Sequence, residues 1–96
     1  MNHSTFEIFE AEARASGFDE ALERHWAPNT VLEAHSHDFD ADAVLTQGEM
    51  WLTCGDSTCH LVPGDTFTLP HGTVHSERYG PEGATYWVAR RIARHS

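Results

Sequence analysis

Turn-forming residues interrupt the chain at short intervals from residue 28 onward, so only short strands fit between them. Every interruption contains a glycine, a proline or an asparagine, and the stretches between them are largely apolar, which is typical of β-strands joined by turns. The predicted strands lie at 22–26, 41–47, 50–54, 60–62, 66–69, 74–79 and 85–91. Seven or eight short strands predict an all-β fold, an antiparallel sandwich or barrel over residues 20–92.

A short helix is predicted before the first strand. Ser4 and Glu7 have the spacing of a capping box, and apolar residues recur from Phe6 onward at helical spacing. Gly17 is a typical C-terminal stop, so the helix is expected over residues 5–16.

Composition and charge narrow the classes of function. Ninety-six residues with 40% hydrophobic content suit a single domain over residues 1–96. The formal charge is −9, which disfavours binding to nucleic acid or to an anionic membrane surface. No stretch reaches the roughly 20 apolar residues of a membrane helix, and residues 1–10 lack the pattern of a signal peptide. We therefore expect a cytoplasmic protein.

Two cysteines, Cys54 and Cys59, flank a turn in a predicted hairpin. Opposite positions of a hairpin approach closely enough for a disulfide, but a reducing cytoplasm disfavours one. We expect two reduced cysteines, with a redox or soft-metal role as the alternative.

Alternation of side chains groups two histidines with apolar residues. If the chain from His35 to Leu45 is extended, His35 and His37 share a face with its apolar side chains, and its acidic residues share the other face. The acidic face is most simply exposed to water, with a calcium-like oxygen site as the alternative. The inward residues are His35, His37, Phe39, Ala41, Ala43 and Leu45, and the outward residues are Ser36, Asp38, Asp40 and Asp42.

Two motifs carry a resemblance to the cupin superfamily. The segment 29–48 contains His35 and His37 and is similar to the first cupin motif, in which a glycine, a His-x-His pair, a glutamate and a second glycine follow at set spacings. Here Asn29 stands at the first glycine and Ala41 at the glutamate. The second cupin motif has glycine, proline, glycine, histidine and asparagine at set spacings, and this chain has all of these residues except the asparagine. The matching residues are Gly64, Pro70, Gly72 and His75, and Tyr79 replaces the asparagine.

The resemblance implies a double-stranded β-helix, or jelly-roll barrel, whose histidines bind a metal ion. Carried over to this chain, the ligands are His35, His37 and His75. Because Ala41 replaces the carboxylate ligand of the family, the expected set is three neutral imidazoles. Such a set suits one divalent transition metal, iron, zinc, nickel or copper, better than manganese or magnesium. The alternative is three ordinary hydrogen-bonded histidines in a barrel without metal.

Glu77 is the candidate catalytic residue. Alternation on the strand that carries His75 puts Glu77 and Tyr79 on the same face, so a carboxylate and a phenol are expected beside the metal. We interpret Glu77 as an added ligand, an acceptor for a histidine N–H, or a general base. An ion pair with Arg90 or Arg91 is the alternative, because a buried carboxylate needs a partner.

The expected pocket has room for a small substrate. Ala41 and Ala43 widen it, Tyr79 lies beside the metal, and His71 is placed at the pocket mouth. An outward Trp51, alternating with its apolar neighbours, predicts a homodimer surface.

Two classes of function fit these residues, and both involve a small-molecule partner. The first is a metal-dependent enzyme, an oxygenase, isomerase or lyase, because three-histidine iron sites in the family resemble those of thiol and diketone dioxygenases. The second is a binding or sensing module whose metal or bare barrel holds an anion or a sugar-like ligand without turnover. The sequence has no phosphate-binding loop, dinucleotide-binding glycine motif or nucleophilic-serine elbow.

Overall fold

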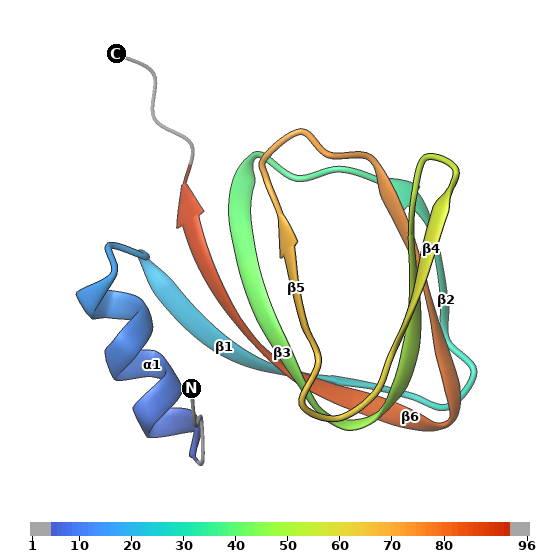
Figure 1. Ribbon diagram of the computed structural model, residues 1–96, viewed down its shortest axis with the longest axis horizontal. Coiled ribbons are helices and arrows are strands. Elements are labelled where there is room, and N and C mark those ends of the chain that lie inside the picture. Colours follow the sequence, from blue (N-terminus) through green and yellow to red (C-terminus); the bar gives the residue numbers. More distant parts are fainter. Residues whose placement is uncertain (1–4, 93–96) are drawn as a thin grey trace.

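Within residues 5–92, which the computed structural model describes, a short helix is followed by six strands (Figure 1). The elements are α1 (Phe6–Ala15), β1 (Glu20–Trp26), β2 (Val31–His35), β3 (Phe39–Cys54), β4 (Ser57–Leu61), β5 (Thr66–Leu69) and β6 (His75–Ile92). The antiparallel β fold with one N-terminal helix confirms the predicted fold class. In this part of the chain no helix has the length and apolar character needed to cross a bilayer.

Strands β3 and β6 run through the whole sheet. The strand order is β1-β6-β3-β4, with β2 also paired to β6 and β5 also paired to β3, and every pair is antiparallel. The C-terminal part of β6 lies between β1 and the first part of β3, whereas its N-terminal part lies between β2 and the last part of β3. The sheet therefore curls into two halves, β1-β6-β3-β5 and β2-β6-β3-β4, around a barrel interior (Figure 1).

The two halves meet where β3 and β6 bend. The register of β3 against β6 shifts on both sides of Gly48, which has a φ of +77°. A Cβ atom at Gly48 would overlap the carbonyl oxygen of Gly83 and lie 2.8 Å from the Cα of Ala84. Glycine is thus required at this corner by both its backbone angle and the close approach of β6.

The predicted strand ends at Gly48 and at residues 80–83 are wrong. Both positions lie inside continuous strands, so the predicted strands 41–47 and 50–54 are one strand, and so are 74–79 and 85–91. Glycine bends these strands without ending them. Strand β2 is missing from the sequence prediction because apolar and polar residues do not alternate strictly in Val31–His35. The exposure of these side chains does not alternate strictly either.

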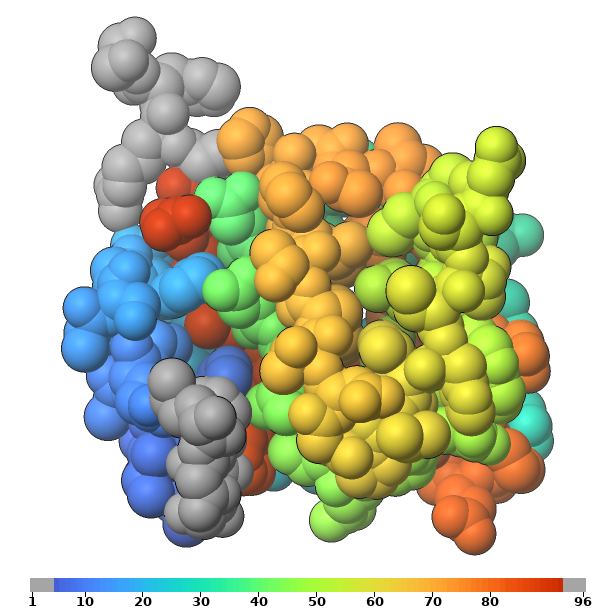
Figure 2. Space-filling view, viewed as in Figure 1, coloured from blue at the N-terminus to red at the C-terminus, as the bar shows by residue number. Residues whose placement is uncertain are grey.

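Helix α1 packs on the outer face of the sheet, along one side of the molecule (Figure 2). The hydroxyl of Thr5 accepts a 3.1 Å hydrogen bond from the Ile8 N–H and caps the helix, while the predicted cap Ser4 lies outside the described residues. Gly17, with a φ of +93°, follows the C-terminus as predicted. The helix contact is a hydrophobic cluster of Phe9, Ala13, Ala21, Val44 and Ala89, flanked by Phe6, Phe18 and Trp87.

The main hydrophobic cluster fills much of the barrel interior. Leu45 and Met50 are completely buried, and the predicted inward alternation of Ala41, Ala43 and Leu45 is confirmed. The buried members are Ala41, Ala43, Leu45, Met50, Leu52, Leu61, Leu69, Tyr79, Ala84, Tyr86 and Val88. This packing fixes the strands that carry the candidate site.

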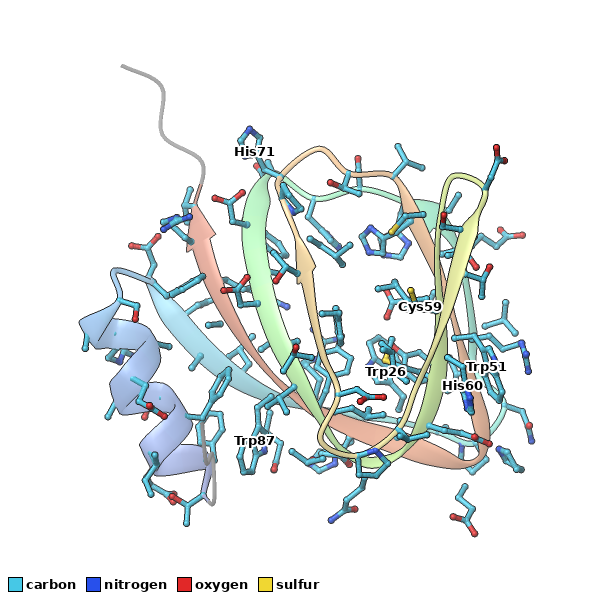
Figure 3. All side chains as sticks on the ribbon, viewed as in Figure 1. Trp26, Trp51, Cys59, His60, His71 and Trp87 are labelled. Atoms are coloured by element: carbon cyan, nitrogen blue, oxygen red, sulfur yellow. The ribbon has the colours of Figure 1, made fainter. Side chains whose placement is uncertain are left out.

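Both cysteines are free. Cys54 pairs with Ser57 and Cys59 pairs with Leu52, so the two thiols do not occupy opposite positions of the β3–β4 hairpin. Figure 3 shows Cys59 together with the labelled tryptophans and histidines.

Candidate metal centre

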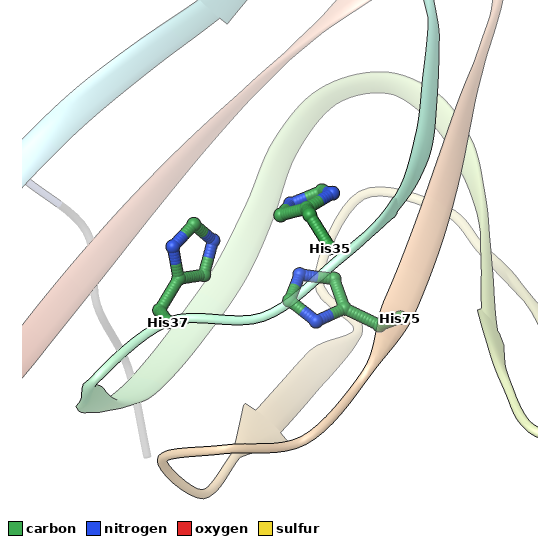
Figure 4. A group of neighbouring side chains, drawn as sticks. All are labelled: His35, His37 and His75. Atoms are coloured by element: carbon green, nitrogen blue, oxygen red, sulfur yellow. The ribbon is translucent and has the colours of Figure 1, made fainter.

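Two paired strands and the connection after one of them bring three histidine rings together (Figure 4). His35, the last residue of β2, pairs directly with His75, the first residue of β6. His37 lies in the connection 36–38, where the extended segment predicted from His35 to Leu45 is interrupted. The carbonyl oxygen of His37 accepts a 2.7 Å hydrogen bond from the Gly72 N–H, which ties this connection to the turn before β6.

One ring nitrogen of each histidine lies within 4.8 Å of the other two. The ring centroids are 4.4 Å apart for His35 and His75, 4.9 Å for His35 and His37, and 5.4 Å for His37 and His75. His75 is buried, His35 is half-buried and His37 is exposed, so the cluster runs from the barrel interior to its surface. The structure thus brings together the three histidines that the sequence singles out.

Backbone carbonyl groups fix the tautomer of two of the rings. The Nδ1 of His35 lies 2.7 Å from the Glu33 carbonyl oxygen, and the Nδ1 of His75 lies 3.0 Å from the Thr73 carbonyl oxygen. Because a carbonyl oxygen only accepts, each Nδ1 carries the hydrogen and donates it. In the neutral rings both Nε2 atoms therefore keep a free lone pair, which is the form that binds a metal ion.

The carboxylate of Glu77 faces these lone pairs. Its Oε2 lies 3.5 Å from the Nε2 of His35 and 3.3 Å from the Nε2 of His75, and its Oε1 accepts a hydrogen bond from the Tyr79 hydroxyl. Three electron-pair donors thus converge on one buried point, which a positive charge would stabilise. The alternative ion pair with an arginine is not formed, because within residues 5–92 Arg90 pairs with Glu20 and Arg91 with Asp40.

Burial and neighbouring charges shift two nearby pKa values. Partial desolvation, followed by His35, His75 and the positive charge of Arg90, lowers the pKa of His37 below its ordinary value. This shift favours the neutral ring, as metal binding requires. Desolvation by burial is the main cause that raises the pKa of Tyr79, so its phenol stays protonated and serves as a donor to Glu77.

The donor set fits a transition metal ion after a small adjustment. Nitrogen ligands bind zinc at about 2.0–2.1 Å, so two of them lie at most about 4.2 Å apart. The 4.8 Å limit in the cluster is slightly wider. His37 is the exposed member and its ring is the farthest from His75, so rotation of its side chain can close this difference.

A cavity of about 90 Å³ lies beside the histidines. Its lining residues are Arg24, Trp26, Leu32, His35, His37, Phe39, Ala41, Phe67, Leu69, His75, Glu77, Tyr86, Val88 and Arg90. A larger groove of about 320 Å³ lies between α1 and β5 and is lined by none of the three histidines. The smaller cavity is therefore the one in which a ligand could reach them.

Of the other predicted pocket residues, the structure places Ala41 at the cavity and three elsewhere. Ala41 lines the cavity, but Ala43 is buried in the adjoining core and Tyr79 lies beneath Glu77. His71 points away from the barrel (Figure 3), where its backbone N–H and Nδ1 bind Asp40 at 2.8 and 3.0 Å. These bonds, followed by Arg91, hold the pKa of Asp40 at about 2.

Comparison with known proteins places this site in a family. The AraC-like ligand binding domain family matches residues 17–92. The chain belongs to this family. No curated protein matches the sequence.

Solved structures show that this AraC-like domain has a cupin fold. A protein of unknown function from Rhizobium leguminosarum bv. viciae 3841 superposes with a TM-score of 0.74 at 19% identity, covering 97% of this chain and 100% of its own. An RmlC-like cupin from Shewanella frigidimarina superposes with a TM-score of 0.66 at 20% identity, covering 78% of this chain and 67% of its own. A chain from the structures of the DMSP lyases RdDddP and RnDddQII superposes with a TM-score of 0.71 at 19% identity. The match covers 77% of this chain but only 38% of the other chain.

Two arginines line the cavity of this AraC-like domain, of which the sequence predicts Arg90 only as a partner for Glu77 and does not single out Arg24. Arg24 pairs with Tyr86 on the inward face of β1 and β6, and Arg90 pairs with Ala41 on the inward face of β6 and β3. The sequence contains a pattern that indicates the inward position of Arg24. In a strand every second residue shares a face, and Arg24 shares its face with the apolar residues Leu22 and Trp26. Long cationic side chains are normally expected at the surface, which hides this signal.

Proposed function

We propose that this AraC-like domain is a metal-dependent cupin that binds a small molecule, with His35, His37 and His75 holding one divalent transition metal ion. The observation that supports this most directly is the convergence of the His35 and His75 Nε2 lone pairs on Glu77 Oε2. Three imidazoles favour iron, zinc, nickel or copper. A bound ion would supply Lewis acidity to a ligand in the cavity.

Within this proposal, the chain's own residues prepare the site for proton transfer. Tyr79 donates to one oxygen of Glu77 and leaves the other oxygen directed at the histidines, so Glu77 is positioned either to join the ligand set or to accept a proton from a bound molecule. This arrangement favours an enzyme, an oxygenase, isomerase or lyase. The family match favours the second candidate, a module that binds its ligand without turnover.

The test of the proposed function uses the chain purified without a histidine tag. Titration with zinc, iron, nickel and copper is expected to give one ion bound per chain, measured by calorimetry and elemental analysis. Oxygen uptake with thiols, diketones and flavonols then separates the enzyme from the binding module. Light scattering on the same sample measures the homodimer that Trp51 predicts. A chain that takes up none of the four metals would contradict the proposal.

The Glu77→Gln variant is expected to lower metal affinity by about 10–100-fold, the range found when a group next to metal ligands is lost. Glutamine keeps the size of the side chain but removes the negative charge that faces both Nε2 atoms. Competition with a chromophoric chelator measures the affinity. Glu49→Gln is the matched control, because Glu49 binds His60 at 2.8 Å instead and lines no part of the histidine cavity. Equal metal affinities in the two variants would show that Glu77 does not contribute to metal binding.

A further inference from the structure

The charge of the cavity is opposite to that of the chain as a whole. The chain has fifteen acidic residues against six arginines and lysines, yet Arg24 and Arg90 both line the cavity and Glu77 is the sole acidic residue in its described lining. A divalent ion at the histidines would add further positive charge. The walls thus present cationic groups in a confined and partly desolvated space, which favours an anion.

Arg90 contributes to the wall of this cavity and has an unused donor. Its Nε is buried and has no hydrogen-bond partner, whereas its NH1 makes a long contact of 3.4 Å with Glu20. The guanidinium lies 4.7 Å from the ring centroid of Phe39, which in turn stacks on His37 at 4.7 Å. Buried N–H groups without an acceptor are costly, so an acceptor from a ligand is expected at this Nε.

Arg24 supplies the second positive charge. It is half-buried, lines the same cavity and forms no ion pair with another described residue, and its guanidinium carbon lies 5.0 Å from the ring centroid of Trp26. The rest of the wall is largely apolar. Leu32, Phe67, Leu69 and Val88 contribute to it.

We propose that the cavity binds a small organic carboxylate, which accepts a hydrogen bond from the Arg90 Nε–H and extends toward the three histidines. The size of the cavity supports a small organic carboxylate. A volume of about 90 Å³ has room for roughly six to nine water molecules, or about as many non-hydrogen atoms of a ligand. The apolar wall suits a carbon skeleton, which inorganic phosphate lacks, and the guanidinium suits a planar carboxylate. The proposal deepens the proposed function, since the metal site lies at the other end of the ligand.

Calorimetry with lactate, pyruvate, lactamide and inorganic phosphate tests this proposal on zinc-loaded and on metal-free protein. Lactate and pyruvate are expected to bind at least about tenfold more tightly than neutral lactamide, which has nearly the same shape, and more tightly than phosphate. Equal binding of lactate and lactamide, stronger binding of phosphate, or no binding of either carboxylate would each overturn the proposal.

The Arg90→Gln variant is expected to weaken lactate binding by at least about tenfold, measured on the metal-free protein. Arg90→Lys keeps the charge but lacks the Nε–H donor, so it is expected to weaken binding as well and covers the case in which Arg90→Gln fails to fold. Arg91→Gln is the matched control, because Arg91 binds Asp40 outside the cavity at 3.2 and 3.3 Å. Wild-type lactate affinity in both Arg90 variants would overturn the proposal.

The metal titration of the same samples separates this proposal from the metal site. If the wild-type chain takes up none of the four metals but its metal-free form binds lactate through Arg90, the proposed function fails and the carboxylate site stands. If zinc binds and lactate does not, the carboxylate site fails alone.

Discussion

Replacing His75 by alanine is expected to lower metal affinity by at least about a hundredfold. His75 is 3% exposed, its Nδ1 hydrogen is held by the Thr73 carbonyl, and its Nε2 faces Glu77 at 3.3 Å. Loss of a group that only orients a ligand costs about 10–100-fold in metal affinity, so loss of a ligand is expected to reach or exceed the upper end of that range. Competition with a chromophoric chelator, on protein without a histidine tag, measures the change.

Two further variants make this result interpretable. His60→Ala is the control, because His60 stacks on Trp51 at 4.6 Å on the outside of the barrel and is expected to keep wild-type metal affinity. His37→Ala removes an exposed histidine of the cluster and is expected to lose affinity without disturbing the core. Retention of wild-type affinity in both His75→Ala and His37→Ala would show that the ion, if any, binds elsewhere.

The Gly48→Ala substitution is expected to destabilise the fold by about 3 kcal/mol or more. A left-handed backbone costs a residue with a Cβ about 1–2 kcal/mol, and forcing an atom into a filled space adds about 1–3 kcal/mol. At Gly48 both costs apply, because φ is +77° and the new Cβ would overlap the backbone of Gly83. Urea denaturation followed by tryptophan fluorescence measures the free energy of unfolding.

Gly55→Ala is the matched control for the corner. Gly55 also has a left-handed φ, +59°, but a Cβ there would meet nothing within 4 Å. Its cost is therefore expected to stay at about 1–2 kcal/mol. If the two substitutions destabilise the protein equally, the close approach of β3 and β6 at Gly48 does not contribute to the free energy of unfolding.

The sequence predicts the elements of this fold better than their boundaries. The helix and the inward alternation of Ala41, Ala43 and Leu45 follow from local periodicity, which a single sequence displays. The wrong ends at Gly48 and at residues 80–83 have a common cause. A glycine pattern looks the same at a turn and at a bend in a long strand, and only the pairing of β3 with β6 distinguishes them.

The candidate site was predictable to the extent that it depends on alternation and motif spacing. These place His35 and His75 together and turn Glu77 inward, and the structure agrees on all three positions. The free donor of Arg90 and the carbonyl groups that fix the histidine tautomers depend on contacts between distant segments. Such contacts leave no local pattern, so they become visible only in three dimensions.

The continuity of β3 and β6 limits how this domain can respond to a ligand. Both strands pass through both halves of the barrel, so the halves cannot open and close like a clamshell without breaking the pairing at the bends. We therefore expect adjustment to an incoming molecule in the connections next to the histidines, 36–38 and 70–74, which are joined by the hydrogen bond from Gly72 to His37. A bound ligand is thus expected to change the chain locally, around His37, and to leave the pairing of β3 with β6 intact.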